Sequence, residues 1–206
     1  MKIPAILGST LVLLYASTSS SQAVAVAILN QSFENPGGGS FSYPPANNWV
    51  TSSFTEISTD VGLSGGHLLR HNGQNPGSSA SQDLGVGLLT DSIYTLTISI
   101  GNRTTDVNNP TGTAIFGLTA GGTDQAVFTQ VASSLVPGGT FRDFAYTFTT
   151  GAVAPTGNVG IRLGAAVGGR GLFDNVRLDV SPVPEPGTTL CALLGGLLIA
   201  RRRRCR

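Results

Sequence analysis

The part of this chain that could fold into a domain contains no cysteine. Both cysteines, Cys191 and Cys205, lie close to the C-terminus. The preceding residues therefore have no thiol to form a disulfide framework and no cysteine nucleophile. Such a domain must be held together by burial of apolar side chains.

Basic side chains are also scarce outside the two ends. Between Val24 and Ser181 there are six Arg and ten Asp or Glu, a formal charge of −4. The affinity of a protein for nucleic acid comes mostly from Lys and Arg on phosphates. The sequence therefore excludes nucleic acid as an expected partner.

Groups typical of catalytic sites are few. The only histidines, His67 and His71, could share one face of a strand and approach a metal, but no third ligand is near in sequence. The alternative is that both are ordinary polar positions. No Gly-x-Ser-x-Gly motif occurs, and the carboxylates show no pairing that indicates glycoside hydrolysis, Glu34, Glu56, Asp60 and Asp83 among them. We therefore expect that the protein is not an enzyme.

The first 23 residues have the layout of a secretory signal. Lys2 precedes an apolar run over residues 3–15, a polar stretch follows, and Ala23 ends a small-residue cleavage site. An uncleaved N-terminal anchor is the alternative, although the apolar run is short for a membrane span. We expect residues 1–23 to form a signal helix that signal peptidase removes.

The C-terminal end changes composition abruptly. Residues 181–187 are a Pro-rich linker, and residues 188–200 are almost wholly apolar. As a helix this stretch would be about 20 Å long, a marginal span of a hydrocarbon core of about 30 Å. Five arginines follow and would hold the end in the cytoplasm: Arg201, Arg202, Arg203, Arg204 and Arg206. A plain tail anchor is one interpretation.

The same tail resembles the PEP-CTERM sorting signal. Pro184, Glu185 and Pro186 match its recognition motif, and a short hydrophobic transmembrane helix with the Arg cluster follows in residues 188–206. The resemblance implies processing by an exosortase in a Gram-negative bacterium that makes an exopolysaccharide. We expect export through the inner membrane, which the tail occupies transiently, to the cell surface or extracellular matrix.

Residues 28–180 predict a single all-β domain, an antiparallel β-sandwich. Apolar and polar residues alternate in short segments that Gly-rich turns separate, and no segment has helical periodicity. In residues 94–100, Tyr94, Leu96, Ile98 and Ile100 would share the buried face. Similar segments occupy residues 114–118, 144–148, 159–163 and 172–180.

Several pieces in order resemble a carbohydrate-binding-module jelly roll of the galactose-binding-like class. They are residues 30–34 with a Gly-rich turn and Trp49, then residues 66–70, 94–98, 144–148 and 172–178. The resemblance implies a β-sandwich that often carries a structural calcium and sometimes binds sugar chains. Tyr43 and Trp49 are the candidate glycan-binding aromatics, although packing of Trp49 in the core is the favoured alternative.

Asp174 and Glu34 are the candidate metal ligands. By strand alternation Asp174 shares the apolar face of residues 172–180, and a buried carboxylate needs a partner or a metal. Glu34 occupies a position that resembles the family's metal-binding edge. We expect one structural calcium, completed by backbone carbonyls. The alternative is that Asp174 accepts hydrogen bonds from backbone amides while Glu34 lies in solvent.

Together these features predict a non-catalytic surface or matrix protein that contacts exopolysaccharide. A structural or adhesion module without a sugar ligand is the first alternative, and an envelope enzyme is the second. The fold does not decide between them, because function resides in the site.

Overall fold

The computed structural model describes residues 22–35, 46–52, 55–58, 68–71, 79–103, 112–166 and 169–184. One compact unit spans Gln22–Val183, and Met1–Ser21 with Pro184–Arg206 forms a second unit that lies almost wholly outside the described residues. The predicted signal helix and sorting tail lie almost wholly outside the described residues. No helix within the described ranges is long and apolar enough to cross a membrane.

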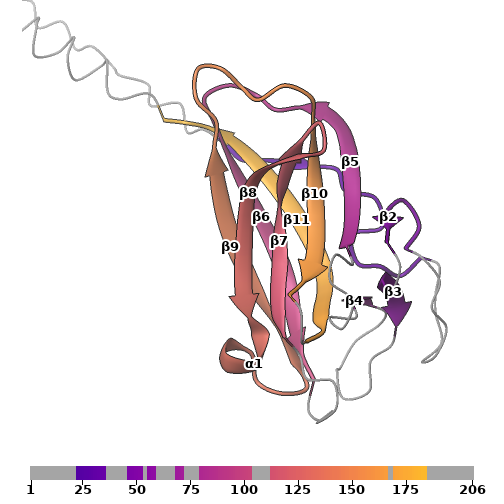
Figure 1. Ribbon diagram of the computed structural model, residues 1–206. Coiled ribbons are helices and arrows are strands. Elements are labelled where there is room, and N and C mark those ends of the chain that lie inside the picture. Colours follow the sequence, from indigo (N-terminus) through magenta and orange to yellow (C-terminus); the bar gives the residue numbers. More distant parts are fainter. Residues whose placement is uncertain are drawn as a thin grey trace, which may run out of the picture. The chain divides into compact units, whose positions relative to one another are not determined.

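The Gln22–Val183 unit is an antiparallel β-sandwich of two sheets (Figure 1). Sheet A has the strand order β3-β4-β11-β6-β9, and β1 also pairs with β11. Its strands are β1 (Val24–Val26), β3 (Thr55–Ser58), β4 (Leu68–His71), β6 (Ser92–Asn102), β9 (Thr140–Thr149) and β11 (Gly171–Pro182). Sheet B has the order β2-β5-β10-β7-β8, with β2 (Val50–Thr51), β5 (Ser79–Gly87), β7 (Thr113–Ala120), β8 (Thr123–Val131) and β10 (Asn158–Ala165).

The connections pass repeatedly from one sheet to the other. The chain crosses between sheets from β5 to β6, from β8 to β9 through the short helix α1 (Ala132–Leu135), and again on either side of β10. Only β7 and β8 form a hairpin within sheet B; its turn is Gly121-Gly122, where both residues have positive φ. The predicted all-β, antiparallel jelly-roll sandwich is confirmed.

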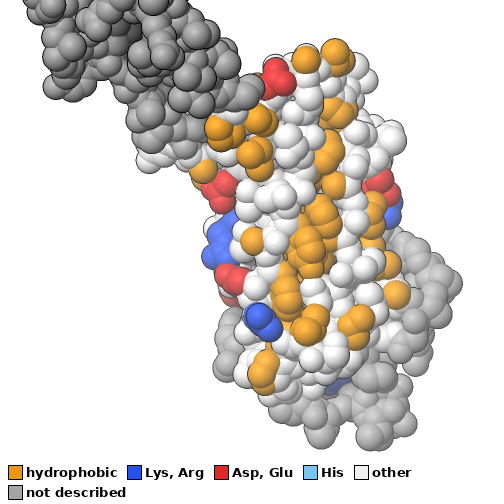
Figure 2. All heavy atoms as spheres, turned by 90° about the vertical axis from the view of Figure 1, so that its left-hand side faces the viewer, with side chains coloured by type: hydrophobic (Ala, Val, Ile, Leu, Met, Phe, Trp, Pro, Cys, Tyr) orange, Lys and Arg blue, Asp and Glu red, His pale blue; other side chains and the backbone are white. Residues whose placement is uncertain are grey.

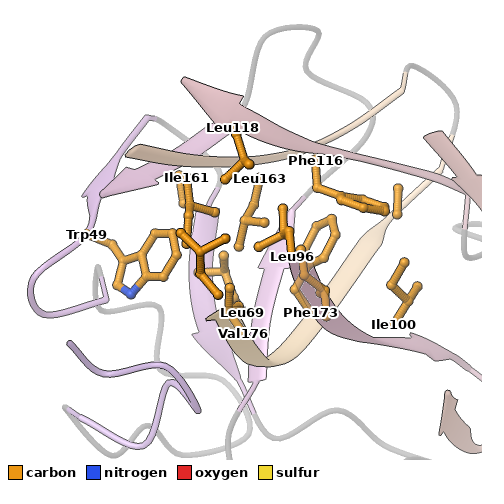
Figure 3. Close-up of a cluster of buried hydrophobic side chains, with 14 of the residues drawn as sticks. Trp49, Leu69, Leu96, Ile100, Phe116, Leu118, Ile161, Leu163, Phe173 and Val176 are labelled. Carbon is orange, nitrogen blue, oxygen red and sulfur yellow. The ribbon is translucent and has the colours of Figure 1, made fainter. Parts of the chain in front are cut away.

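The core is the layer between the sheets (Figure 3). Tyr94, Leu96, Ile98 and Ile100 of β6 are all at most 2% exposed, as their alternation predicted. They face side chains of sheet B that are equally buried, Phe116, Leu118, Ile161 and Leu163. Complete burial of each such side chain stabilises the fold by about 1.5–3 kcal/mol.

At the side where β8 and β9 lie, the two sheets are bridged by side chains that are only partly buried. β8 is the last strand of sheet B and β9 is the last strand of sheet A. The inner sides of these two edge strands carry only partly buried aromatic residues, Phe128 on β8 and Phe144, Tyr146 and Phe148 on β9. The sandwich therefore has one aromatic, incompletely covered side.

Candidate functional site

Trp49 is part of the core. It is 5% exposed, its ring lies 5.3 Å from that of Phe33, and its Nε1–H donates to the Asn30 carbonyl at 3.3 Å. A buried indole cannot stack on a sugar, so the glycan-binding prediction for Trp49 is corrected and its packing in the core is confirmed. Tyr43, the other predicted aromatic, lies outside the described residues.

Gln82 fixes the loops around Trp49. Its side-chain oxygen accepts from the Leu29 amide at 2.9 Å, and its side-chain nitrogen donates to the carbonyls of Leu29 at 2.9 Å and Asn48 at 3.0 Å. Gln82 is 6% exposed, so the loss of its partners would leave polar groups unpaired in the protein interior. These contacts make the loops part of the folded framework.

A β-bulge in β11 determines where Asp174 points. Asp174 is paired with Ser99 and Arg177 with Thr97, so β11 has one more residue than β6 across this interval. Asn175 has a φ of 46°, and the Val176 amide donates to Gln31 at 3.0 Å. The extra residue reverses the alternation, which places Asp174 beside Ser99, on the face opposite Phe173 and Ile98. The inward orientation predicted from strict alternation is therefore wrong.

Asp143, Ser99 and Asp174 form a row across β9, β6 and β11 on this face. The Ser99 hydroxyl donates to Asp143 Oδ1 at 2.5 Å, and the Arg177 guanidinium forms an ion pair with the other carboxylate oxygen. The hydrogen bond from Ser99 and the pairing with Arg177 hold the pKa of Asp143 below its ordinary value, against a smaller opposing effect of burial. Asp143 is thus a fixed anion at neutral pH.

Asp174 has the opposite electrostatic environment. Burial, together with the charges of Glu34 and Asp143, raises its pKa to about 6, although a hydrogen bond from the Asn175 amide at 2.7 Å acts against this. A divalent cation would offset both the burial and the repulsion from Glu34, and carboxylate oxygens suit calcium. The two residues fit such an ion only with other oxygen donors, because the described residues contain no group of three or more His, Cys, Asp and Glu that could hold a metal.

The side chains of the two histidines lie outside the part of the chain that the structure describes. His67 lies outside the described residues, and of His71 only the backbone, paired with Thr55 in β3 and with Gly171 in β11, is described.

A second candidate site is the open seam, which we define as Phe128 and Gln130 on β8 together with Phe144, Tyr146 and Phe148 on β9. The rings of Phe128 and Tyr146 are stacked, with centroids 4.6 Å apart and an interplanar angle of 28°. Below them Phe116, which is 1% exposed, meets Tyr146 edge-on at 5.0 Å. The Tyr146 hydroxyl donates to Gln130 Oε1 at 2.5 Å.

More apolar surface lies on the outer face of β8 and on α1. Val127, Val131 and Leu135 are 48%, 45% and 45% exposed, and all lie on β8 or α1. Figure 2 shows this side of the molecule, with apolar side chains in a strip along its length and most charged side chains at the margins. Arg142 lies at the α1 end, where its guanidinium is 5.5 Å from the centre of the Phe144 ring and donates to the Leu135 carbonyl at 3.2 Å.

The described domain matches one protein family over almost its whole length. The model of the HpiC1-like family, described as HpiC1 cyclase, matches residues 24–179. The chain belongs to the HpiC1-like cyclase family. No characterised protein sequence matches it significantly.

Solved cyclase structures from Fischerella share the fold. A Stig cyclase, Fisc, from Fischerella sp. TAU, in complex with (3Z)-3-(1-methyl-2-pyrrolidinylidene)-3H-indole, aligns with a TM-score of 0.66 and 22% identity over 78% of this chain and 99% of that one. A cyclase from the same organism, in complex with 4-(1H-indol-3-yl)butan-2-one, aligns with a TM-score of 0.63 and 22% identity, covering 77% of this chain and 98% of that one. A family 35 carbohydrate-binding module from Clostridium thermocellum aligns at a TM-score of only 0.45, with 14% identity over 73% of this chain and 96% of the module.

Membership in this family corrects the functional expectation. The sequence was expected to encode a non-catalytic surface protein, and the family match over residues 24–179 points instead to an enzyme of the cyclase type. The expectation failed because it required an activated nucleophile, a metal cluster or a carboxylate pair. Positioning of two parts of one substrate also contributes to catalysis, and it has no motif of reactive residues.

The sequence patterns did not predict the open seam either. The alternation of Phe144, Tyr146 and Phe148 was recognised, but the facing residues of β8 were not assigned to a strand. The signal that could have found β8 is the alternation of Ala126, Phe128 and Gln130 directly after the Gly121-Gly122 turn.

Proposed function

We propose that the Gln22–Val183 unit is a cyclase that closes a ring within one apolar substrate. The observation that carries the proposal is the match of the HpiC1-like family model to residues 24–179, which covers nearly the whole compact unit. In a reaction of this type the protein holds two reactive parts of one molecule close together and in the correct orientation, which favours the conformation that reacts.

We infer further that the substrate carries an indole ring. Both Fischerella cyclase structures were determined with indole-containing ligands, and they share this fold over nearly their full length. The 1H-indole of the second ligand is a flat apolar ring with one N–H donor, whereas the 3H-indole of the first has a ring nitrogen that only accepts. Sites for such ligands combine apolar walls with a few polar groups.

Incubation of the purified protein with 3-substituted indoles that bear an alkene or a second nucleophile tests the proposal. A cyclisation gives a product with the substrate's mass, or that mass less one water, at a new chromatographic retention time. We expect such a product with native protein and none with heat-denatured protein. Absence of turnover with every member of the panel would contradict the assignment as a cyclase.

We propose that Glu34 and Asp174 hold one structural calcium at the β11 bulge. The supporting observations are the charge of Glu34 acting on Asp174 and the hydrogen bond between Val176 and Gln31, which attaches the loop that carries Glu34 to the bulge. The calcium would stabilise the folded state and take no part in the reaction.

We propose that the enzyme is exported and then sorted at its C-terminus. The support is the signal layout of residues 1–23 and the resemblance of residues 183–206 to the PEP-CTERM signal, which imply signal peptidase and an exosortase as partners. The intact mass of the native protein should show that both ends are missing. A mature protein that retains Arg201–Arg204 and Arg206 would show that the tail is an ordinary anchor.

A further inference from the structure

The open seam combines a partly exposed aromatic surface with a polar pair of side chains. Phe128 and Tyr146 are only partly buried, although Phe116 beneath them is fully buried. The seam also contains a polar pair, because Tyr146 donates to Gln130 across the gap between the two sheets. The aromatic surface is thus accessible and has one hydrogen-bonding group at a fixed position.

The hydrogen bond from Tyr146 to Gln130 fixes the chemistry that the seam offers. Since the phenol hydrogen is directed at Gln130 Oε1, the lone pairs of the Tyr146 oxygen remain able to accept a hydrogen bond. A ligand placed against the two stacked rings would therefore meet an acceptor. A flat aromatic ring with an N–H donor matches both the exposed aromatic surface and this acceptor.

The seam is also held in place before any ligand arrives. Tyr146 is fixed at its hydroxyl by Gln130 and at its ring edge by Phe116, 5.0 Å away, and Phe128 packs on Phe116 at 5.9 Å. At the far end Arg142 lies over Phe144 and is attached to α1 through the Leu135 carbonyl. Side chains that are already ordered lose little conformational entropy on binding, which favours a binding surface.

We propose that the open seam is the substrate-binding surface of this enzyme, where the exposed surface of Phe128 and Tyr146 contacts an aromatic ring and the Tyr146 oxygen accepts its N–H. This inference rests on the proposed cyclase function for its choice of occupant. Tyr146 and Gln130 are positioning residues in this scheme, because they fix the orientation of the ring and take no part in bond formation. Binding at the seam does not require Asp143, Ser99 or Asp174, which lie in a row on the outer face of sheet A.

Binding of indole and of 1-methylindole to the purified protein, measured by calorimetry, tests the inference without requiring turnover. Wild-type protein should bind indole more tightly, by about three- to ten-fold, because only indole can donate to Tyr146. Tyr146→Phe keeps the ring and should abolish this preference. Phe128→Leu removes one aromatic ring and should weaken the binding of both probes to a similar extent, by about three- to ten-fold.

Tyr94→Phe is the matched control for the loss of a tyrosine hydroxyl. Tyr94 is 2% exposed and its oxygen accepts from the Leu89 amide at 2.7 Å, so this variant should lose stability and keep the preference for indole. Circular dichroism of each variant confirms that it is folded. A preference that survives in Tyr146→Phe, or a wild-type protein that binds neither probe, would overturn the proposal.

Two further outcomes separate this inference from the proposed function. If indole binds as described but no member of the substrate panel is cyclised, the seam is a ligand site and the cyclase proposal fails. If cyclisation occurs and its KM is unchanged in Phe128→Leu and Tyr146→Phe, the substrate binds elsewhere and the seam proposal fails. Dimers that dissociate in Phe128→Leu, without indole binding, would show that a second copy of the chain covers the seam.

Discussion

Two aromatic pairs among the described residues have different surroundings. Phe33 and Trp49 lie 5.3 Å apart, are 0% and 5% exposed, and have the Trp49 N–H satisfied by the Asn30 carbonyl. Phe128 and Tyr146 lie 4.6 Å apart and remain partly exposed. The first pair is closed by loops that Gln82 fixes, and the second joins the edge strands β8 and β9 of the two sheets.

This difference separates structural aromatic residues from aromatic residues that can bind a ligand. A closed pair contributes its buried area to the stability of the fold and has no face left for another molecule. An open pair contributes less to stability and keeps a face available. Substitutions should therefore affect stability at the first pair and binding at the second.

The largest effect is expected from Phe33→Ala at the closed pair. Removal of a fully buried ring leaves a cavity beside Trp49 and should lower the free energy of unfolding by about 3–5 kcal/mol. Urea denaturation, followed by the fluorescence of the single Trp, measures the change. A loss below about 1 kcal/mol would mean that the loops close over the cavity and that the pair is less firmly packed than described.

Removal of the proposed calcium should have the next largest effect on the stability of the closed pair, because Glu34 directly follows Phe33. At calcium one hundred times its dissociation constant the ion would stabilise the protein by about 2.7 kcal/mol. Calcium should raise the melting temperature, a chelator should lower it, and Asp174→Asn should abolish the difference. Asp179→Asn, on the same strand, is the matched control and should keep the response. An unchanged wild-type melting temperature after chelation would exclude the site.

At the open pair, Phe128→Ala should cost only about 1–2 kcal/mol, because the ring is partly exposed and its loss leaves no closed cavity. Its binding of indole should fall below detection. Phe33→Ala, where it remains folded, should bind indole as the wild type does. Thermal melts and calorimetry on the same samples measure both quantities. If Phe128→Ala were as destabilising as Phe33→Ala, the distinction between closed and open pairs would fail.

The smallest effect is expected on the outer face of β9, behind the seam. Asp143→Asn loses charge-assisted contacts with Ser99 and Arg177 at an exposed position and should cost less than about 1 kcal/mol at pH 7. Since the pKa of Asp143 in the folded state lies below its ordinary value, this contribution is present above about pH 4 and disappears as the pH falls through that lower pKa.

Melting curves of wild type and Asp143→Asn from pH 7 to pH 3 should therefore converge at the acidic end. Asp124→Asn is the matched control on sheet B, where Asp124 pairs with Arg162 at 3.1 Å. A difference that grows as the pH falls would contradict the lowered pKa of Asp143. Unchanged indole binding in Asp143→Asn is expected, because its side chain lies on the face of β9 opposite Tyr146.

The strands could be predicted from the sequence where the signal is local. Alternation in residues 94–100 and 144–148 identified β6 and β9 and the buried side of each, because side chains of a strand point alternately to its two faces. The same rule failed at Asp174. The bulge there depends on a hydrogen bond from Val176 to Gln31, far away in the sequence, and on the left-handed backbone of Asn175.

The candidate site was harder to predict because it is assembled from two sheets. Phe128 and Tyr146 meet only when the edge of sheet B lies against the edge of sheet A, and no spacing within the sequence encodes that contact. The enzyme assignment failed for a related reason. A search of the sequence for nucleophiles and metal ligands detects only reactive groups. The open seam consists mostly of aromatic side chains that belong to neither class.

Backbone and indole N–H resonances of the ¹⁵N-labelled protein during an indole titration test the comparison most directly. Trp49 is the single Trp, so its Nε1–H gives one unique signal from the closed pair. The account predicts shifts at residues 127–131 of β8 and 144–148 of β9, with the Trp49 signal unchanged. Shifts at Trp49 and residues 29–35, with β8 and β9 unaffected, would contradict the assignment of the open seam as the ligand-binding surface.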